Sequence, residues 1–165
     1  MITLVLGGAR SGKSTYAERL MEHLLPPITY VATLQLGDDR DLLDRVARHR
    51  KRRPDGWRTA EAGLDLTSVV RSLAGSVLLD SLGPWVAAHG EDGTVDSAPL
   101  CRALVERAGD SVVVSEEVGL GVHPSSAAGR HFRDTLGILN QDVAAVADQV
   151  LLIVAGRALP LHRAP

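Results

Sequence analysis

Short apolar runs and longer amphipathic segments alternate along the chain. The first run, ITLVL at residues 2–6, stops at Gly7 and Gly8. An apolar run of this length bounded by glycines is typical of a buried β-strand. The same pattern predicts further strands over residues 28–33, 76–80, 111–115 and 149–156, and it allows a short terminal strand after them.

The segments between the runs carry apolar residues at helical spacing. The segment after Gly12 has one apolar stripe, formed by Tyr16, Ala17, Leu20, Met21 and Leu24. Two prolines at positions 26 and 27 end it, because proline is not tolerated in a helix interior. The pattern predicts helices over residues 13–25, from Asp38 or Asp39 toward Arg53, and over residues 64–73, 99–108 and 130–147.

Strands that are apolar throughout and separated by helices indicate a parallel sheet that is covered on both faces. We therefore expect an α/β fold built on one mostly parallel sheet. The polar stretch 89–98, rich in Gly and Asp, is expected to be a surface loop. The 165 residues show no repeat, low-complexity tract or second domain, so we expect a single domain over residues 1–165.

Composition narrows the class of protein. Hydrophobic residues make up 45% of the chain and charged residues 23%, as in an ordinary soluble globular protein. No apolar run reaches the ~18 residues of a membrane-spanning helix, so we expect no membrane association. The single cysteine, Cys101, excludes an internal disulfide, and the first residues form a strand pattern rather than a signal peptide. We therefore expect a cytoplasmic protein.

Positive charge is concentrated in the segment RVARHRKRRP at residues 45–54. It contains six arginines and lysines, yet the formal net charge of the chain is -2, so the remainder is acidic. A local cluster suits a compact polyanion such as a nucleoside triphosphate better than an extended nucleic-acid backbone. Aromatic residues, at 3%, are also too few for surfaces that stack single-stranded bases. We therefore expect no nucleic-acid partner.

The stretch GGARSGKS matches the phosphate-binding pattern G-x-x-x-x-G-K-[ST] between a predicted strand and a predicted helix. Glycines allow backbone N–H groups to surround phosphate oxygens, and the helix N-terminus adds a partial positive charge. In such a loop Lys13 reaches the β- and γ-phosphates, and the Ser14 hydroxyl binds Mg²⁺. The alternative is a chance glycine-rich turn. The loop residues predicted to bind the triphosphate are Gly7, Gly8, Ala9, Arg10, Ser11, Gly12, Lys13 and Ser14.

A phosphate loop also needs a carboxylate on a neighbouring strand to hold Mg²⁺ or its water. Asp80 ends the run VLLD, and strand carboxyl ends converge on the ligand edge of such sheets. The alternative role for Asp80 is to cap a helix that begins at Ser81. Glu116 and Glu117 end the next predicted strand at the same edge. A general base, a metal ligand and a solvated loop pair remain open for these two glutamates.

The basic segment contains one titratable ring, His49. On a helix Arg45 and His49 share one face, which Arg52 or Arg53 extends. Neighbouring cations disfavour the charged imidazolium, which keeps a ring nitrogen available as a nucleophile near pH 7. The same cations would neutralise a triphosphate and its leaving pyrophosphate. An ordinary surface histidine is the alternative that the spacing alone leaves open.

Longer segments carry a family resemblance. They are GGARSGKS, YVATLQ, RVARHRKRRPDGW followed by RTAE, LLDSLGPWV, EEVGLGVHP and GRHFRDTLGILNQDVAAVADQVLLIVAG. In this order they span nearly the whole chain, and R-V-x-x-H-x-x-x-R-P is distinctive. Together they resemble the bifunctional adenosylcobinamide kinase / adenosylcobinamide-phosphate guanylyltransferase family of cobalamin biosynthesis. The resemblance implies a P-loop NTPase fold with a RecA-like, mostly parallel sheet and helices on both faces.

The resemblance also implies a two-step reaction. Adenosylcobinamide first receives the γ-phosphate of ATP or GTP on its aminopropanol hydroxyl. Its phosphate then receives GMP from GTP, giving adenosylcobinamide-GDP. In the family GMP passes through a covalent histidine intermediate, and the matching residue here is His49. The family forms homotrimers, which we carry over as an expectation.

Residue by residue, the resemblance assigns catalysis to His49 and Lys13. Glu61 is a physically reasonable guanine reader, because a carboxylate can accept two N–H groups from the base; an exposed carboxylate with no such role is the alternative. Metal binding is expected at Ser14 and Asp80. Beyond the loop, nucleotide contacts are expected at Ala32, Thr33, Leu34, Arg50, Lys51, Arg52, Arg53, Glu61 and Asp80.

One departure from the family is Glu116, where the family usually has asparagine before the glutamate of E-V-G. Two other functions fit parts of the sequence. A monofunctional P-loop kinase for another small alcohol explains the loop and Asp80 but gives His49 no role. A non-catalytic nucleotide switch or RecA-like nucleic-acid factor predicts salt-dependent binding to DNA or RNA.

Overall fold

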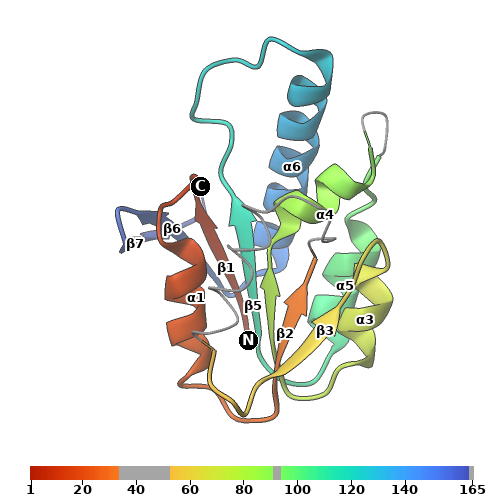
Figure 1. Ribbon diagram of the computed structural model, residues 1–165, viewed down its shortest axis with the longest axis vertical. Coiled ribbons are helices and arrows are strands. Elements are labelled where there is room, and N and C mark those ends of the chain that lie inside the picture. Colours follow the sequence, from red (N-terminus) through yellow and green to blue (C-terminus); the bar gives the residue numbers. More distant parts are fainter. Residues whose placement is uncertain (34–52, 91–93, 164–165) are drawn as a thin grey trace.

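The computed structural model describes residues 1–33, 53–90 and 94–163. In this part of the chain seven strands form one sheet, in the order β3-β2-β4-β5-β1-β6-β7 (Figure 1). The strands are β1 Ile2–Gly7, β2 Ile28–Ala32, β3 Arg58–Glu61, β4 Ser76–Asp80, β5 Ser111–Glu116, β6 Gln149–Val154 and β7 Arg157–Leu161. The described helices are α1 Lys13–Met21, α3 Leu66–Ser72, α4 Leu82–Ala88, α5 Ala98–Glu106 and α6 Ala127–Val146.

The sheet is parallel except at one edge, where β7 runs antiparallel to β6. All six residues of β1 are buried, as expected for a central strand covered on both faces. The antiparallel pair is joined by a tight turn in which Ala155 and Gly156 both have positive φ, at 51° and 73°. These findings confirm the mostly parallel α/β sheet predicted from the apolar runs.

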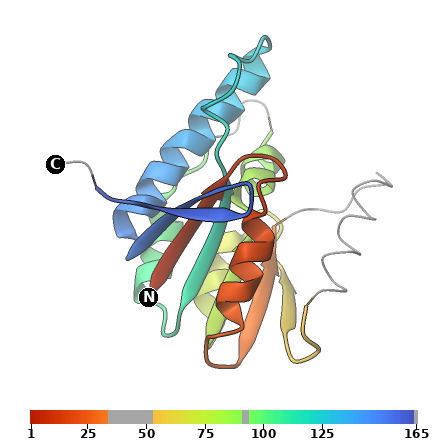
Figure 2. The same cartoon turned by 90° about the vertical axis from the view of Figure 1, so that its left-hand side faces the viewer.

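Helices cover the two faces of the sheet unequally. Helix α1 packs on one face, where Ala17 and Met21 are fully buried against the strands (Figure 2). Helices α3, α4, α5 and α6 cover the opposite face, with a second buried cluster between them and the sheet. Within the described ranges, no helix combines the length and the apolar character needed to cross a lipid bilayer. Both faces are thus protected, and the carboxyl edge of the strands stays available for a site.

The predicted strands and helices are all found where they fall on described residues, with small shifts at their ends. Helix α6 begins at Ala127, before the predicted start, because the Ser126 hydroxyl caps it by accepting a hydrogen bond from the N–H of Gly129. The helix predicted from Asp38 or Asp39 lies outside the described residues except for its last residue, Arg53. Of the predicted loop 89–98, residues 94–97 lie outside helices and strands, and α5 begins at Ala98.

Strand β3 was not predicted, and helix α4 was raised only as the alternative in which Asp80 caps a helix beginning at Ser81. Strand β3, with the sequence RTAE, has no apolar run because it lies at the sheet edge and is largely exposed. Helix α4 contains Gly83 and Pro84, which read as turn residues in the sequence. Both lie in its first turn, where proline is tolerated because the N–H groups have no partner within the helix.

Strand β4 lies inside the sheet, between β2 and β5, and contributes side chains to the core. Leu79 is fully buried in it, whereas Leu25 is 81% exposed. We expect Leu79→Ala to lower the free energy of unfolding by about 2–5 kcal/mol, because it leaves a cavity in a close-packed core. Leu25→Ala, the matched control, should change it by less than about 0.5 kcal/mol. Chemical denaturation of both variants checks this, and equal effects would show that β4 is not central to the core.

Candidate active site at the carboxyl edge of the sheet

The predicted phosphate loop, residues 7–14, runs from the last residue of β1 into the first turn of α1. Arg10 and Gly12 adopt positive φ, at 56° and 94°, which bends the backbone sharply. Gly12 is the N-cap residue of α1, and no side chain caps this helix. Its first N–H groups therefore have no capping partner from a side chain, which is the arrangement that binds phosphate at helix N-termini.

The loop is held against the turn between β6 and β7. The N–H of Gly156 donates to the carbonyl oxygen of Ser11 at 2.8 Å. A Cβ atom at Gly7 would lie 2.5 Å from the Ser11 hydroxyl and 2.9 Å from the carbonyl oxygen of Ile153. Only glycine fits there, so the sequence pattern and the backbone path agree.

Lys13 is buried although it carries a charge. Its side chain is 6% exposed, and its Nζ donates to the carbonyl oxygen of Gly8 at 3.4 Å. The same Nζ lies 3.6 Å from Oε1 of Glu116. A buried ammonium needs such partners, because removing it from water is costly. The ammonium is therefore fixed above the loop, where the phosphates of a nucleotide would lie.

Ser14 and Asp80 meet although they lie far apart in the sequence. The Ser14 hydroxyl donates to Oδ1 of Asp80 at 3.1 Å. The N-cap residue of α4 is Ser81, so Asp80 does not cap that helix, and the alternative role predicted for it is wrong. A hydroxyl and a carboxylate beside a phosphate loop are hard oxygen donors, which suits Mg²⁺ bound mainly by phosphates and water. The pair therefore fits the metal predicted from the sequence.

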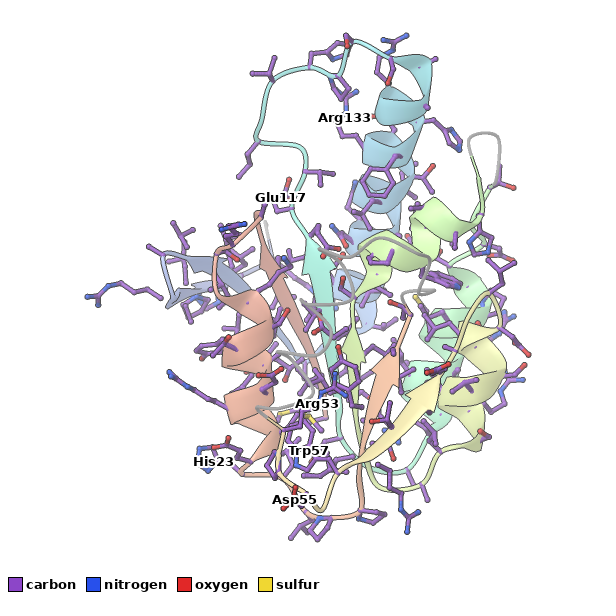
Figure 3. The ribbon with its side chains drawn as sticks, in the orientation of Figure 1. His23, Arg53, Asp55, Trp57, Glu117 and Arg133 are labelled. Atoms are coloured by element: carbon purple, nitrogen blue, oxygen red, sulfur yellow. The ribbon has the colours of Figure 1, made fainter. Side chains whose placement is uncertain are left out.

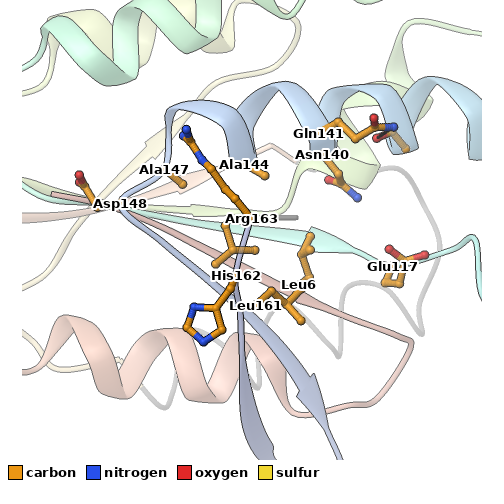
Figure 4. A pocket seen from close by; sticks show the side chains of 12 residues that line it. Leu6, Glu117, Asn140, Gln141, Ala144, Ala147, Asp148, Leu161, His162 and Arg163 are labelled. Carbon is orange, nitrogen blue, oxygen red and sulfur yellow. Dashed lines mark hydrogen bonds between the residues drawn. The ribbon is translucent and has the colours of Figure 1, made fainter. Parts of the chain in front are cut away.

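The two glutamates at the end of β5 point to opposite faces. Val114 packs in the cluster under α1, and side chains alternate along a strand, so Glu116 lies on the α1 face with Lys13. Glu117 follows it, and its Oε1 accepts from the N–H of Gly119 at 2.7 Å (Figure 3). Glu117 also lines a cavity of about 670 Å³ beside α6 (Figure 4). The two residues therefore do not form a solvated pair.

Tyr30 was not predicted as a site residue, and it links Asp80 to Arg53. Its hydroxyl donates to Oδ2 of Asp80 at 3.1 Å, and the Arg53 guanidinium lies 3.3 Å above its ring centroid. Burial and the charge of Asp80 raise the pKa of Tyr30 well above its ordinary value, so this hydroxyl stays protonated. The sequence offers no local signal for this contact, because it depends on strand pairing.

The remaining predicted residues lie further along the same edge. Ala32 pairs in register with Asp80 on one side and with Glu61 on the other, and Thr33 follows, fully buried. Glu61 is four strand spacings from the end of β1, roughly 19 Å, so a nucleotide touching both must extend along the edge. Ala9 and Arg10 are exposed. Outside the described residues lie Leu34, His49, Arg50, Lys51 and Arg52.

Comparison with solved structures supports the class that the fold and loop define. A type III secretion ATPase of pathogenic bacteria aligns with a TM-score of 0.56 and 11% identity, covering 96% of this chain and 56% of the ATPase. The ATPase EscN of enteropathogenic E. coli gives 0.57 and 13%, covering 93% of this chain and 43% of EscN. This chain thus spans about half the length of these ATPases. The shared architecture is the P-loop NTPase fold, as predicted.

Sequence comparison identifies the family. Residues 3–161 match the family described as cobinamide kinase / cobinamide phosphate guanyltransferase, and the chain belongs to it. The bifunctional adenosylcobalamin biosynthesis protein CobP of Pseudomonas aeruginosa is 39% identical, with 100% of this chain and 99% of CobP covered. CobU of Salmonella typhimurium, with the same description, is 38% identical over 94% of this chain and 97% of CobU. The family and enzyme class predicted from the sequence are confirmed.

Tyr30 generates a prediction about alkaline pH. Because its pKa is raised in the folded state, the unfolded chain loses this proton above pH ~10 while the folded chain keeps it. Stability should therefore fall as pH rises above 10, by up to about 1.4 kcal/mol per pH unit from this group. Tyr30→Phe should show a shallower fall than Tyr16→Phe, the control. Denaturation at pH 9 and 11 checks this, and equal slopes would contradict it.

Proposed function

We propose that this protein phosphorylates adenosylcobinamide with ATP or GTP and then transfers GMP from GTP to the new phosphate, giving adenosylcobinamide-GDP. The observation that carries the proposal is the meeting of Lys13, Ser14 and Asp80 at one loop, in a chain that matches the kinase/guanyltransferase family over residues 3–161. The relatives' shared description as bifunctional adenosylcobalamin biosynthesis proteins supports a place in cobalamin synthesis.

In the kinase step, the backbone N–H groups of residues 7–14 hold the triphosphate, and Lys13 contacts its β- and γ-phosphates. The acceptor hydroxyl oxygen forms a bond to the γ-phosphorus while the bond from that phosphorus to the bridging β-oxygen breaks. The nucleoside diphosphate leaves, and the hydroxyl proton passes to solvent. The role of Lys13 is to offset the negative charge that accumulates as the bridging oxygen departs.

Ser14 and Asp80 would hold Mg²⁺ in this site, and Tyr30 would keep Asp80 oriented toward it. When bound, the ion supplies positive charge next to the β- and γ-phosphate oxygens. The hydrogen bond between Ser14 and Asp80 keeps both oxygen donors at the same point of the edge before the ion arrives.

In the guanylyl step, a ring nitrogen of His49 bonds to the α-phosphorus of GTP, and pyrophosphate leaves. An oxygen of the corrinoid phosphate then displaces the ring nitrogen, which restores the histidine and forms the product diphosphate. The cations Arg50, Lys51, Arg52 and Arg53 would share the charge of the leaving pyrophosphate, and Glu61 would read guanine. Arg53 stacks on the Tyr30 ring, and the Tyr30 hydroxyl donates to Asp80.

The assembly and location expected from the resemblance are also proposals. We propose that residues 1–165 act as one catalytic domain, that the chain forms a homotrimer, and that it works in the cytoplasm. No nucleic acid or membrane is a partner in this proposal. Size-exclusion chromatography with light scattering tests the trimer directly.

Lys13→Ala tests the kinase assignment. Removing the ammonium should lower phosphoryl transfer to cobinamide by about 10²–10³-fold, because the charge of the transition state loses its nearest cation. The control is Arg19→Ala, which removes an exposed cation from the same helix and should leave the rate unchanged. The measurement is nucleoside diphosphate formed per minute. A normal rate for Lys13→Ala in folded protein would overturn the phosphate-loop assignment.

His49→Ala tests the guanylyl step. Wild-type protein incubated with Mg²⁺ and GTP labelled at the α-phosphorus should retain label after denaturation, stable in alkali and lost in acid, as a phosphoramidate behaves. His49→Ala should retain none while keeping much of its kinase activity. His23→Ala, at an exposed histidine just after α1, should label normally. Label that persists in His49→Ala would place the nucleophile elsewhere, and no label in active wild-type protein would leave a kinase alone.

A further inference from the structure

The ion pair between Lys13 and Glu116 has no role in the chemistry described above. Lys13 is the cation that must meet the phosphates, and its Nζ lies 3.6 Å from Oε1 of Glu116. The Glu116 side chain is 22% exposed, so the pair lies mostly out of water, where charges act strongly on one another. Any triphosphate that binds Lys13 must therefore approach this carboxylate closely.

Contacts from α4 and its N-cap fix the Glu116 carboxylate. The Ser81 hydroxyl donates to Oε1 at 2.7 Å, and the N–H of Gly83 donates to Oε2 at 3.0 Å. A Cβ atom at Gly83 would lie 2.3 Å from Oε2, so this approach depends on glycine. The Asn140 amide also donates to the main-chain carbonyl oxygen of Glu116 at 3.1 Å. The Glu116 side chain cannot turn away from the loop without losing the hydrogen bonds from Ser81 and Gly83.

These contacts bear on two of the roles left open for Glu116, the solvated loop residue and the general base. A solvated loop residue would not accept two hydrogen bonds and an ion pair. Both carboxylate oxygens already accept a protein contact, so the arrangement favours an electrostatic role over collection of the acceptor's proton. The negative charge stabilises the Lys13 ammonium, and the same charge repels a polyphosphate.

We propose that Glu116 is a positioning residue that holds the Lys13 ammonium at the loop and makes triphosphate binding depend on the metal ion. This proposal rests on the proposed nucleotide site at residues 7–14. A metal-free triphosphate must share Lys13 with the Glu116 carboxylate and lie beside its charge. With Mg²⁺ present, the extra positive charge offsets that repulsion. The triphosphate then replaces Glu116 as the ionic partner of Lys13.

The test measures the dissociation constant of the β,γ-imido analogue of ATP by calorimetry, with Mg²⁺ and with EDTA, without corrinoid. The quantity compared is the ratio of the metal-free to the Mg²⁺ dissociation constant. Glu116→Gln keeps the shape and removes the charge, so its ratio should be about tenfold lower than wild type, chiefly through tighter metal-free binding. Glu116→Asp keeps the charge and should keep the wild-type ratio.

The control is Glu106→Gln, which removes the same charge at the last residue of α5. This residue precedes the amino end of β5, opposite the end that carries Glu116, so the ratio should not change. If Glu116→Gln does not fold, Glu116→Asn takes its place with the same expectation. A wild-type ratio in the charge-removing variant, or an equal fall in Glu116→Asp, would overturn the proposal and leave the nucleotide site standing. Wild-type protein that binds no analogue with Mg²⁺ would overturn the nucleotide site and this inference with it.

Discussion

The parallel pairing of β1, β5 and β4 is the constraint on which the site depends. Gly7 pairs with Glu116, and Asp80 pairs with Val114, so three distant segments end at one edge of the sheet. Because side chains alternate along a strand, a shift of one residue in β4 would turn Asp80 to the face under α6. The hydrogen bond from Ser14 to Asp80 exists only in the observed register.

Opposite charges lie close together at this edge. Lys13 is buried, and a lone buried ammonium would be strongly destabilising, so it needs a carboxylate beside it. Glu116 meets that need, while Asp80 is kept in place by hydroxyl groups from Ser14 and Tyr30. In the described part of the chain, Glu116 thus lies beside Lys13, whereas Asp80 accepts from Ser14 and Tyr30.

What the sequence could predict followed from local information. The loop GGARSGKS and the apolar strands are contiguous in sequence, so pattern alone placed Lys13 and Ser14 at the start of the helix that follows β1, where α1 begins. The exposed edge strand β3 had no apolar pattern to reveal it. The face of the sheet on which the Glu116 side chain lies could not be predicted either, because β5 is buried on both faces and its run SVVVS shows no alternation. The contact between Tyr30 and Asp80 needed the strand order, which no local pattern contains.

Tyr30 connects the basic run (the basic segment at residues 45–54) to the proposed kinase site. Arg53 is the last cation of the basic run, and it stacks on Tyr30 while its Nη1 donates to the Thr59 hydroxyl at 3.4 Å. The Tyr30 hydroxyl in turn donates to Asp80, the carboxylate of the phosphate loop. The carboxyl end of the basic run is therefore tied to the kinase site by one aromatic ring. A change at Tyr30 alters both the anchor of the basic run and the orientation of Asp80, so the two steps cannot be tuned independently at this position.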